Sequence, residues 1–140
     1  MSNSKNTDSP KIKNGKTRSQ MRIEVFCSIY QFLLNPDEMV ELENGYEQNV
    51  YLGVLKNIDH LQKLISDHAL GFKQQRLFKV DLSILLVAVF ELLYCPEIPH
   101  QVIIDQALEI AKQYSTQKSS SFINGVLGSI LDSIDRQGKN

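Results

Sequence analysis

The feature that most constrains this chain is a central segment that is apolar on nearly every helical face. Residues 80–94 are dominated by Leu and Val, and Asp81, Ser83 and Glu91 stand in the segment as isolated polar positions. A helix that is apolar all round must be surrounded by other elements. The run is shorter than the roughly 20 residues that cross a bilayer, so we expect a buried central helix and no membrane span.

Apolar residues at helical spacing continue on both sides of this segment. Met21, Val25, Ile29 and Phe32 form a stripe of period 3.6, and Asn35-Pro36 ends that helix. Helices are predicted at about 19–34, 46–65, 80–94, 100–114 and 120–136, and the poorly patterned residues 68–79 are expected to break near Gly71. Because no segment alternates with the period of a strand, the predicted class is all-α, a compact bundle of about six or seven helices.

Length and charge bound the domain organisation. The 140 residues suit one domain, which we place at 19–136 behind a flexible basic arm at 1–18. The first 22 residues hold six Lys or Arg against Asp8, and the remainder carries a net charge of −6. The acidic remainder of the chain repels phosphate on average, so any nucleic-acid contact must be local and must depend on the basic arm. A solvated tail without function is the alternative.

The residues that usually carry catalysis or metal binding are present but scattered. His60, His68 and His100 lack the spacing of a metal site, and Cys27 and Cys95 are expected to be buried free thiols. The glycines of the last helix do not follow a strand, so they form no phosphate loop. We therefore expect no catalysis, no metal and no cofactor, in a protein of the cytoplasm.

Two places favour binding of an anion such as a phosphate. Lys118 precedes three serines and Phe122 at the predicted start of the last helix, where free amides attract negative charge. The hydroxyls of Ser119, Ser120 and Ser121 are expected to cap this helix and to join Lys118 at the anion site. Phe122 either stacks on a base or fills the core of the capped helix. In the first helix, Arg18 and Arg22 lie one turn apart and are expected to project past the edge of the core. Tyr30 farther along either packs inward or stacks on a base.

Four blocks in the second half of the chain follow one another in a recognisable order. They are Phe90–Leu93 (FELL), Glu97–Pro99 (EIP), Ala107–Lys112 (ALEIAK) and Phe122–Leu127 (FINGVL). This order resembles the NusB family of transcription antitermination factors, whose members read approximately YELL, DIP, VINEAVELAKxY and FVNGVLD. The likeness covers about residues 19–131, and its strongest motifs lie after Val80. The loop and helix lengths between the four blocks fit the family without an insertion.

What the resemblance implies is specific. NusB proteins are all-helical bundles that bind the boxA element of RNA together with the ribosomal protein NusE, and the pair helps RNA polymerase read through terminators. The resemblance implies an RNA-binding factor that promotes transcription of ribosomal RNA operons and meets the elongation complex indirectly. By position, the RNA contacts fall on Arg18, Arg22, Tyr30 and Phe122, with Lys118 beside them. Asp81 fits an acidic family position, where it either faces the protein partner or caps a helix.

This chain departs from the family at several of these places. Ser19, Gln20 and Met21 thin the arginine cluster, whereas Lys118 replaces an acid and should favour RNA. The alternative function is a helical protein–protein adaptor that keeps the bundle and has lost RNA binding. NusB-like domains also precede ribosomal-RNA methyltransferase domains, and 140 residues leave no room for one. Monomer and homodimer both remain open.

Overall fold

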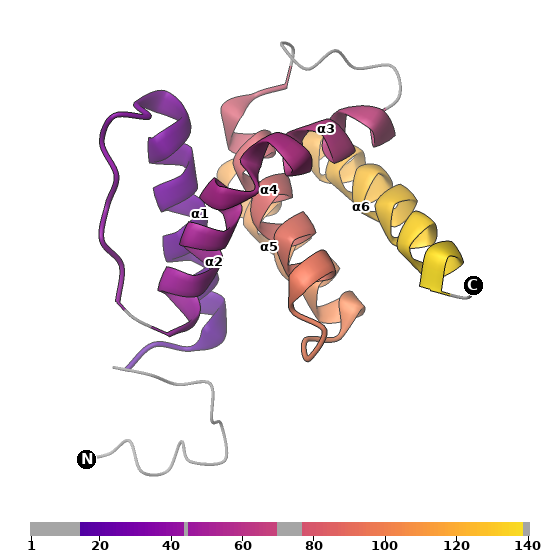
Figure 1. The fold of residues 1–140 in the computed structure, drawn as a ribbon. Coiled ribbons are helices and arrows are strands. Elements are labelled where there is room, and N and C mark those ends of the chain that lie inside the picture. The colour runs from indigo at the N-terminus through magenta and orange to yellow at the C-terminus, as the bar shows by residue number, and fades with distance from the viewer. Residues whose placement is uncertain (1–14, 44, 70–76, 139–140) are drawn as a thin grey trace.

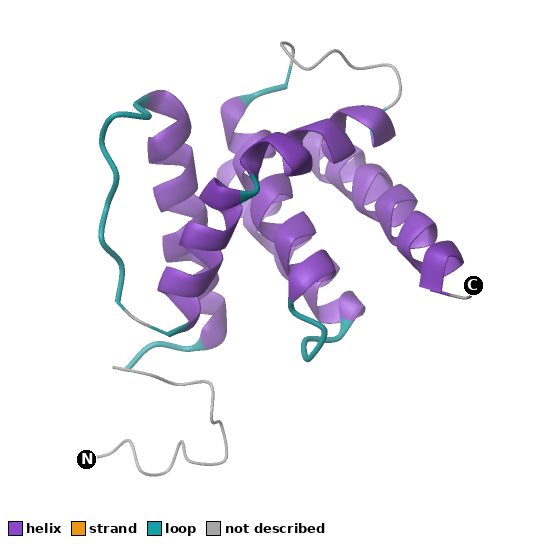
Figure 2. Cartoon of the chain, viewed as in Figure 1, coloured by secondary structure: helices purple, strands orange, loops and turns teal. Residues whose placement is uncertain are grey.

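Six helices make up the described part of the chain. The computed structural model describes residues 15–43, 45–69 and 77–138. The helices are α1 (Arg18–Leu34), α2 (Tyr46–Lys56), α3 (Ile58–His68), α4 (Lys79–Tyr94), α5 (His100–Tyr114) and α6 (Gln117–Gly138). Loops join them, and these ranges hold no strand (Figure 2), which confirms the all-α prediction. Nearly all of the expected basic arm, and the expected break at Gly71, lie outside the described residues.

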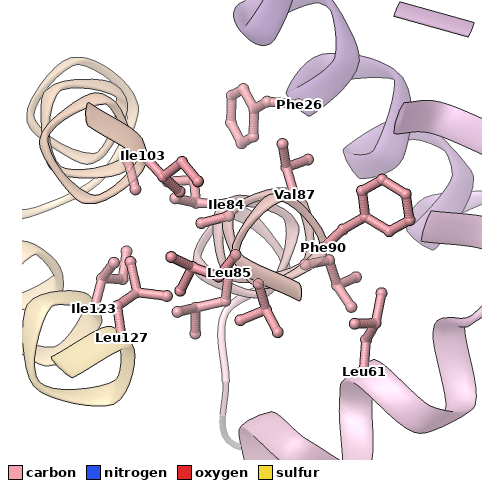
Figure 3. Close-up of a cluster of buried hydrophobic side chains, with 14 of the residues drawn as sticks. Phe26, Leu61, Ile84, Leu85, Val87, Phe90, Ile103, Ile123 and Leu127 are labelled. Carbon is pink, nitrogen blue, oxygen red and sulfur yellow. The ribbon is translucent and has the colours of Figure 1, made fainter. Parts of the chain in front are cut away.

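Helix α4 is the centre of the bundle, as the apolar run predicted. Every residue from Asp81 to Leu92 is buried. In Figure 3 its labelled side chains, Ile84, Leu85, Val87 and Phe90, point toward side chains of the surrounding helices, among them Phe26, Leu61, Ile103, Ile123 and Leu127. Each fully buried side chain of this kind contributes roughly 1.5–3 kcal/mol to stability, so α4 supplies much of the folding free energy.

The predicted helix at 46–65 is in fact two helices. Asn57 ends α2 and begins α3, with φ −110° and ψ 19°, outside the usual helical range. Its side-chain Nδ2 donates a hydrogen bond of 2.8 Å to the Gly53 carbonyl, so the side chain competes with the backbone for that acceptor. The single-helix prediction was wrong because the apolar stripe runs on through Ile58 and Leu61, which hides the break from periodicity.

The start of α6 also differs from the prediction. The helix begins at Gln117, and the cap is Thr116, whose Oγ1 accepts a hydrogen bond of 3.0 Å from the Ser119 amide. The serine triplet therefore lies inside the first turns and does not cap the helix. Serine and threonine are both favoured at the N-cap position, so sequence alone did not decide which hydroxyl would serve.

Neither cysteine is buried in the way we expected. Cys27 is exposed on α1, and Cys95, directly after α4, is partly exposed. Partial burial, and then nearby acidic side chains, raise the pKa of both thiols, that of Cys95 to about 11. The prediction of buried thiols was wrong, and a raised pKa keeps both sulfurs in the unreactive thiol form.

The contact between α2 and α4 depends on a glycine. A Cβ at Gly53 would overlap the ring of Phe90, whereas a Cβ at Gly125 of α6 would meet nothing within 4 Å. We expect Gly53→Ala to lower the free energy of unfolding by about 1–3 kcal/mol through overpacking, measured by urea denaturation. The matched control, Gly125→Ala, should be neutral or raise it by about 0.5–1 kcal/mol. Equal effects of the two variants would contradict this packing.

Candidate nucleic-acid interface

The two arginines at the start of α1 have different surroundings. Arg22 is only 4% exposed, and its Nε donates hydrogen bonds to both carboxylate oxygens of Glu91, at 3.0 and 3.1 Å. Glu91 itself is 1% exposed on α4, where a carboxylate without a partner would be strongly destabilising. Arg22 therefore turns inward to neutralise it. The expectation that Arg22 projects past the edge of the core is wrong.

Tyr46, the first residue of α2, joins this ion pair. Its hydroxyl donates a hydrogen bond of 2.5 Å to Glu91, and the Arg18 guanidinium lies over its ring, 4.3 Å from the centroid. Burial, and then the negative charge of Glu91, raise the pKa of Tyr46 well above its usual value, so the hydroxyl stays protonated and donates. Sequence reasoning placed Tyr46 only at the start of the helix predicted at 46–65 and missed this role.

Arg18 and Arg22 meet at a surface cavity of about 410 Å³. Its lining residues are Arg18, Ser19, Arg22, Glu97, Ile98, Pro99, Val102 and Gln106. Arg18 Nε is buried there without a hydrogen-bond partner in the part of the chain that the structure describes. Helix α5 begins at this cavity without a side-chain cap, and such a helix end favours anions. Two arginines and an uncapped helix end thus face the cavity, together with the carboxylate-bearing side chain of Glu97.

At the opposite end of α4, Asp81 holds the turn between α5 and α6. Its carboxylate is 4% exposed and accepts hydrogen bonds from Ser115 Oγ at 2.6 Å and from Ser119 Oγ at 2.7 Å. Phe78 occupies the N-cap position of α4, so the expectation that Asp81 caps the helix is wrong. The carboxylate is also turned away from solvent, which leaves little of it to face a partner directly.

Lys118 and Phe122 come together on the far side of this turn. They line a cavity of about 250 Å³ whose other walls are Leu77, Phe78, Asp81, Thr116 and Ser119. Phe122 is partly buried against the core, while Phe78 on the cavity wall is 65% exposed. The serine hydroxyls predicted to join Lys118 are separated, because Ser119 binds Asp81 and Ser120 Oγ is buried. The groups on this cavity wall that could contact a ligand are therefore the Lys118 ammonium and the rings of Phe78 and Phe122.

Aromatic side chains of α1 and α5 contact each other near the turn between α5 and α6. Helices α1 and α5 run in the same direction (Figure 1), and the Phe26 ring contacts the Tyr114 ring with centroids 5.3 Å apart. Tyr114 ends α5, is 47% exposed, and was not singled out from the sequence. Tyr30 lies one helical turn beyond Phe26 and is partly buried. Tyr114 is therefore an exposed aromatic side chain directly before the turn that leads to Lys118.

A model of the NusB family matches residues 12–132 of this sequence. The chain belongs to the NusB family. It is 47% identical over 94 residues to the transcription antitermination protein NusB of Clostridium botulinum, which covers 67% of this chain and 71% of the relative. It is 39% identical over 112 residues to the protein of that name from Finegoldia magna, covering 80% and 77%.

Solved NusB structures share the fold. NusB of T. maritima superposes with a TM-score of 0.76 at 31% identity, covering 84% of this chain and 92% of that one. A NusB crystallised with NusE and double-stranded RNA gives a TM-score of 0.72, covering 83% and 96%. At 22% identity this second likeness shows the fold alone. The NusB-like bundle predicted from the four sequence blocks is confirmed.

Other kinds of site find no support within residues 15–43, 45–69 and 77–138. No cluster of His, Cys, Asp and Glu there could hold a metal ion. His68 Nδ1 instead lies 2.7 Å from Ser129 Oγ, which joins α3 to α6. No helix in these ranges is long and apolar enough to cross a membrane. The two cavities, lined by Arg18 and by Lys118 and Phe122, are therefore the candidate functional site of this NusB protein.

The anchoring of the α5–α6 turn can be tested through Asp81. Asp81→Ala leaves the buried Ser119 hydroxyl without its acceptor, and we expect a loss of about 1–3 kcal/mol in the free energy of unfolding. Asp105→Ala removes an exposed carboxylate that accepts a hydrogen bond from Gln101, and it should change the free energy of unfolding by less than about 0.5 kcal/mol. Urea denaturation measures both, and similar values would argue against the anchor.

A second acidic position gives a pH prediction. Glu47 is 2% exposed, and burial, followed by a hydrogen bond with Glu24, raises the pKa of its carboxyl above the ordinary 4.5. Lys16 Nζ opposes this from 3.5 Å and lies 2.9 Å from Glu24. Because the folded protein binds the Glu47 proton more tightly than the unfolded chain, stability from this group is present at low pH and is lost as the pH rises through the folded pKa.

Glu47→Gln cannot ionise and should therefore gain stability relative to the wild type over the pH range that rises from the ordinary carboxyl pKa of 4.5 through the raised pKa of the folded protein. The urea midpoint of both proteins across this range measures the difference. Glu109→Gln, on the exposed face of α5, is the control and should follow the wild-type pH profile. A Glu47→Gln curve parallel to the wild type would contradict the raised pKa.

Proposed function

We propose that this NusB protein is an RNA-binding transcription antitermination factor that binds boxA-type RNA together with ribosomal protein NusE. It would promote transcription of ribosomal RNA operons through the RNA polymerase elongation complex, in the cytoplasm and without a catalytic step. The relatives bear the name of transcription antitermination protein. The observation that carries the proposal is the pair of cavities, one walled by Arg18 and the other by Lys118 and Phe122.

The spacing of the cavities suits a short stretch of RNA. Asp81 and Glu91, which mark the two ends, lie ten residues apart in α4, and that separation is about 15 Å along a helix axis. At about 3.4 Å per nucleotide along a stacked strand, about four nucleotides span it. Unpaired bases would stack on Phe122, Tyr30 and Tyr114, where each stack contributes about 1–3 kcal/mol.

Phosphate contacts would come from few side chains. Arg18 has a buried Nε without a partner and a guanidinium at the cavity, whereas Arg22 already pairs with Glu91 through its Nε. We propose Arg18 and Lys118 as the principal phosphate contacts, with Arg22 supporting the first of them. Each neutralised phosphate of a single strand adds about −0.7 to the slope of log affinity against log salt.

NusE would meet the protein near the start of α4. Asp81 fits an acidic family position for which contact with the protein partner was one of two predictions, and we propose that its buried carboxylate acts by fixing the turn next to the cavity. Phe78, three residues earlier, presents a ring that is 65% exposed. We propose that Phe78 gives NusE an apolar contact beside the position that Asp81 holds in place.

The second candidate function is a protein adaptor without RNA binding. The described residues carry nine Lys or Arg against fifteen Asp or Glu, and one of the two family arginines is buried. An acidic surface with few free cations binds RNA weakly unless the cations are well placed. The measurement that separates the two functions is therefore the effect of single cations on RNA affinity.

Binding of a labelled boxA-type RNA, with and without NusE and at two salt concentrations, tests the proposed function. We expect Arg18→Ala and Lys118→Ala each to weaken binding and to reduce the salt slope by about 0.7. Lys63→Ala is the matched control, since Lys63 is a lysine on α3 that is 76% exposed and pairs with Asp67. Absence of binding by the wild type under all conditions would favour the adaptor.

A further inference from the structure

Glu91 connects three helices through one buried carboxylate. It lies on α4 and accepts hydrogen bonds from Arg22 of α1 and from Tyr46 of α2. A carboxylate held by a guanidinium and a hydroxyl has little freedom to turn, and it fixes the orientation of both donors. The first residue of α2 is thereby positioned against the first turns of α1.

The Tyr46 ring passes this orientation on to Arg18. Its hydroxyl end is fixed by Glu91, and its face lies under the Arg18 guanidinium at 4.3 Å. The Arg22 guanidinium is 5.7 Å from the same ring. A free arginine side chain has several rotatable bonds, so stacking on a fixed ring reduces the conformational entropy that it loses on binding a phosphate.

We infer that Tyr46 and Glu91 are positioning residues for RNA, because they hold the Arg18 guanidinium at the cavity between α1 and α5 without touching the ligand. This inference rests on the proposed RNA-binding function. Arg22 belongs to the same assembly, since it neutralises Glu91 and leaves Arg18 as the cation at the cavity with an unpaired Nε. The site thus depends on side chains from α1, α2 and α4 together.

For the variant Glu91→Gln, the inference and simple electrostatics predict opposite changes in RNA affinity. Glu91→Gln removes a negative charge near the cavity, which by charge alone would raise RNA affinity. Positioning predicts a lower affinity, since the amide holds Arg22 and Tyr46 less firmly than a carboxylate does. An affinity above that of the wild type would overturn the inference, and thermal unfolding of each variant confirms that it is folded.

Tyr46 provides a test that separates positioning from general loss of structure. Tyr46→Phe keeps the ring under Arg18, and Tyr46→Leu removes it. We expect Tyr46→Leu to weaken binding of the boxA-type RNA roughly 3- to 30-fold, the range of a cation–π contact, and Tyr46→Phe to weaken it less. Equal losses in the two variants would contradict the stacking role.

A double-mutant cycle shows whether Tyr46 acts through Arg18. If it does, Tyr46→Leu should have no further effect on RNA affinity in an Arg18→Ala background. An equal fold-loss in both backgrounds would indicate general destabilisation and overturn the inference. In this comparison, failure of the wild type to bind RNA counts against the proposed function, whereas independent losses by a binding wild type count against positioning alone.

The placement of Arg18 can also be measured without RNA. In a ¹⁵N NMR spectrum the Arg18 Nε–H signal should be shifted by the ring current of Tyr46, should keep this shift in Tyr46→Phe, and should lose it in Tyr46→Leu. A signal unchanged in Tyr46→Leu would overturn the inference whether or not RNA binds.

Discussion

The burial of α4 on all sides is the constraint on which the rest of the structure depends. An apolar helix in that place is very stable, but it carries Asp81 and Glu91, which are 4% and 1% exposed. A buried carboxylate must be hydrogen-bonded or paired. Asp81 accepts hydrogen bonds from two serine hydroxyls at the turn between α5 and α6, and Glu91 accepts them from Arg22 and Tyr46. The two carboxylates thus fix the peripheral helices at opposite ends of the bundle.

Both parts of the proposed RNA site are built on these buried carboxylates. The turn that Asp81 holds carries Lys118 and leads to Phe122, and the side chains that Glu91 holds place Arg18. Replacing a buried ion pair with apolar side chains often leaves stability unchanged or improves it. The pair of Arg22 and Glu91 is therefore better explained by the geometry that it imposes on Tyr46 and Arg18 than by stability.

The helical pattern was predictable, whereas the places where polar side chains compete with the backbone were not. Periodicity located α1, α4 and α5 to within about one residue at each end. It missed the break at Asn57, whose amide bonds the Gly53 carbonyl while the apolar stripe continues past it. It also put the cap of α6 on the serine triplet, although Thr116 provides it. Local hydrogen bonds of this kind leave no trace in apolar spacing.

By itself, the sequence determined the all-α class, the central place of α4 and membership of the NusB family, because apolar periodicity and the four blocks are local patterns. It also named Arg18, Lys118 and Phe122 as candidates for RNA contact. Only the tertiary structure decided that Arg22 turns inward, that the Arg18 guanidinium lies over the Tyr46 ring, and that Tyr114 contacts Phe26. The partners in these contacts are far apart in the chain, and the direction of a charged side chain depends on which buried group it must neutralise.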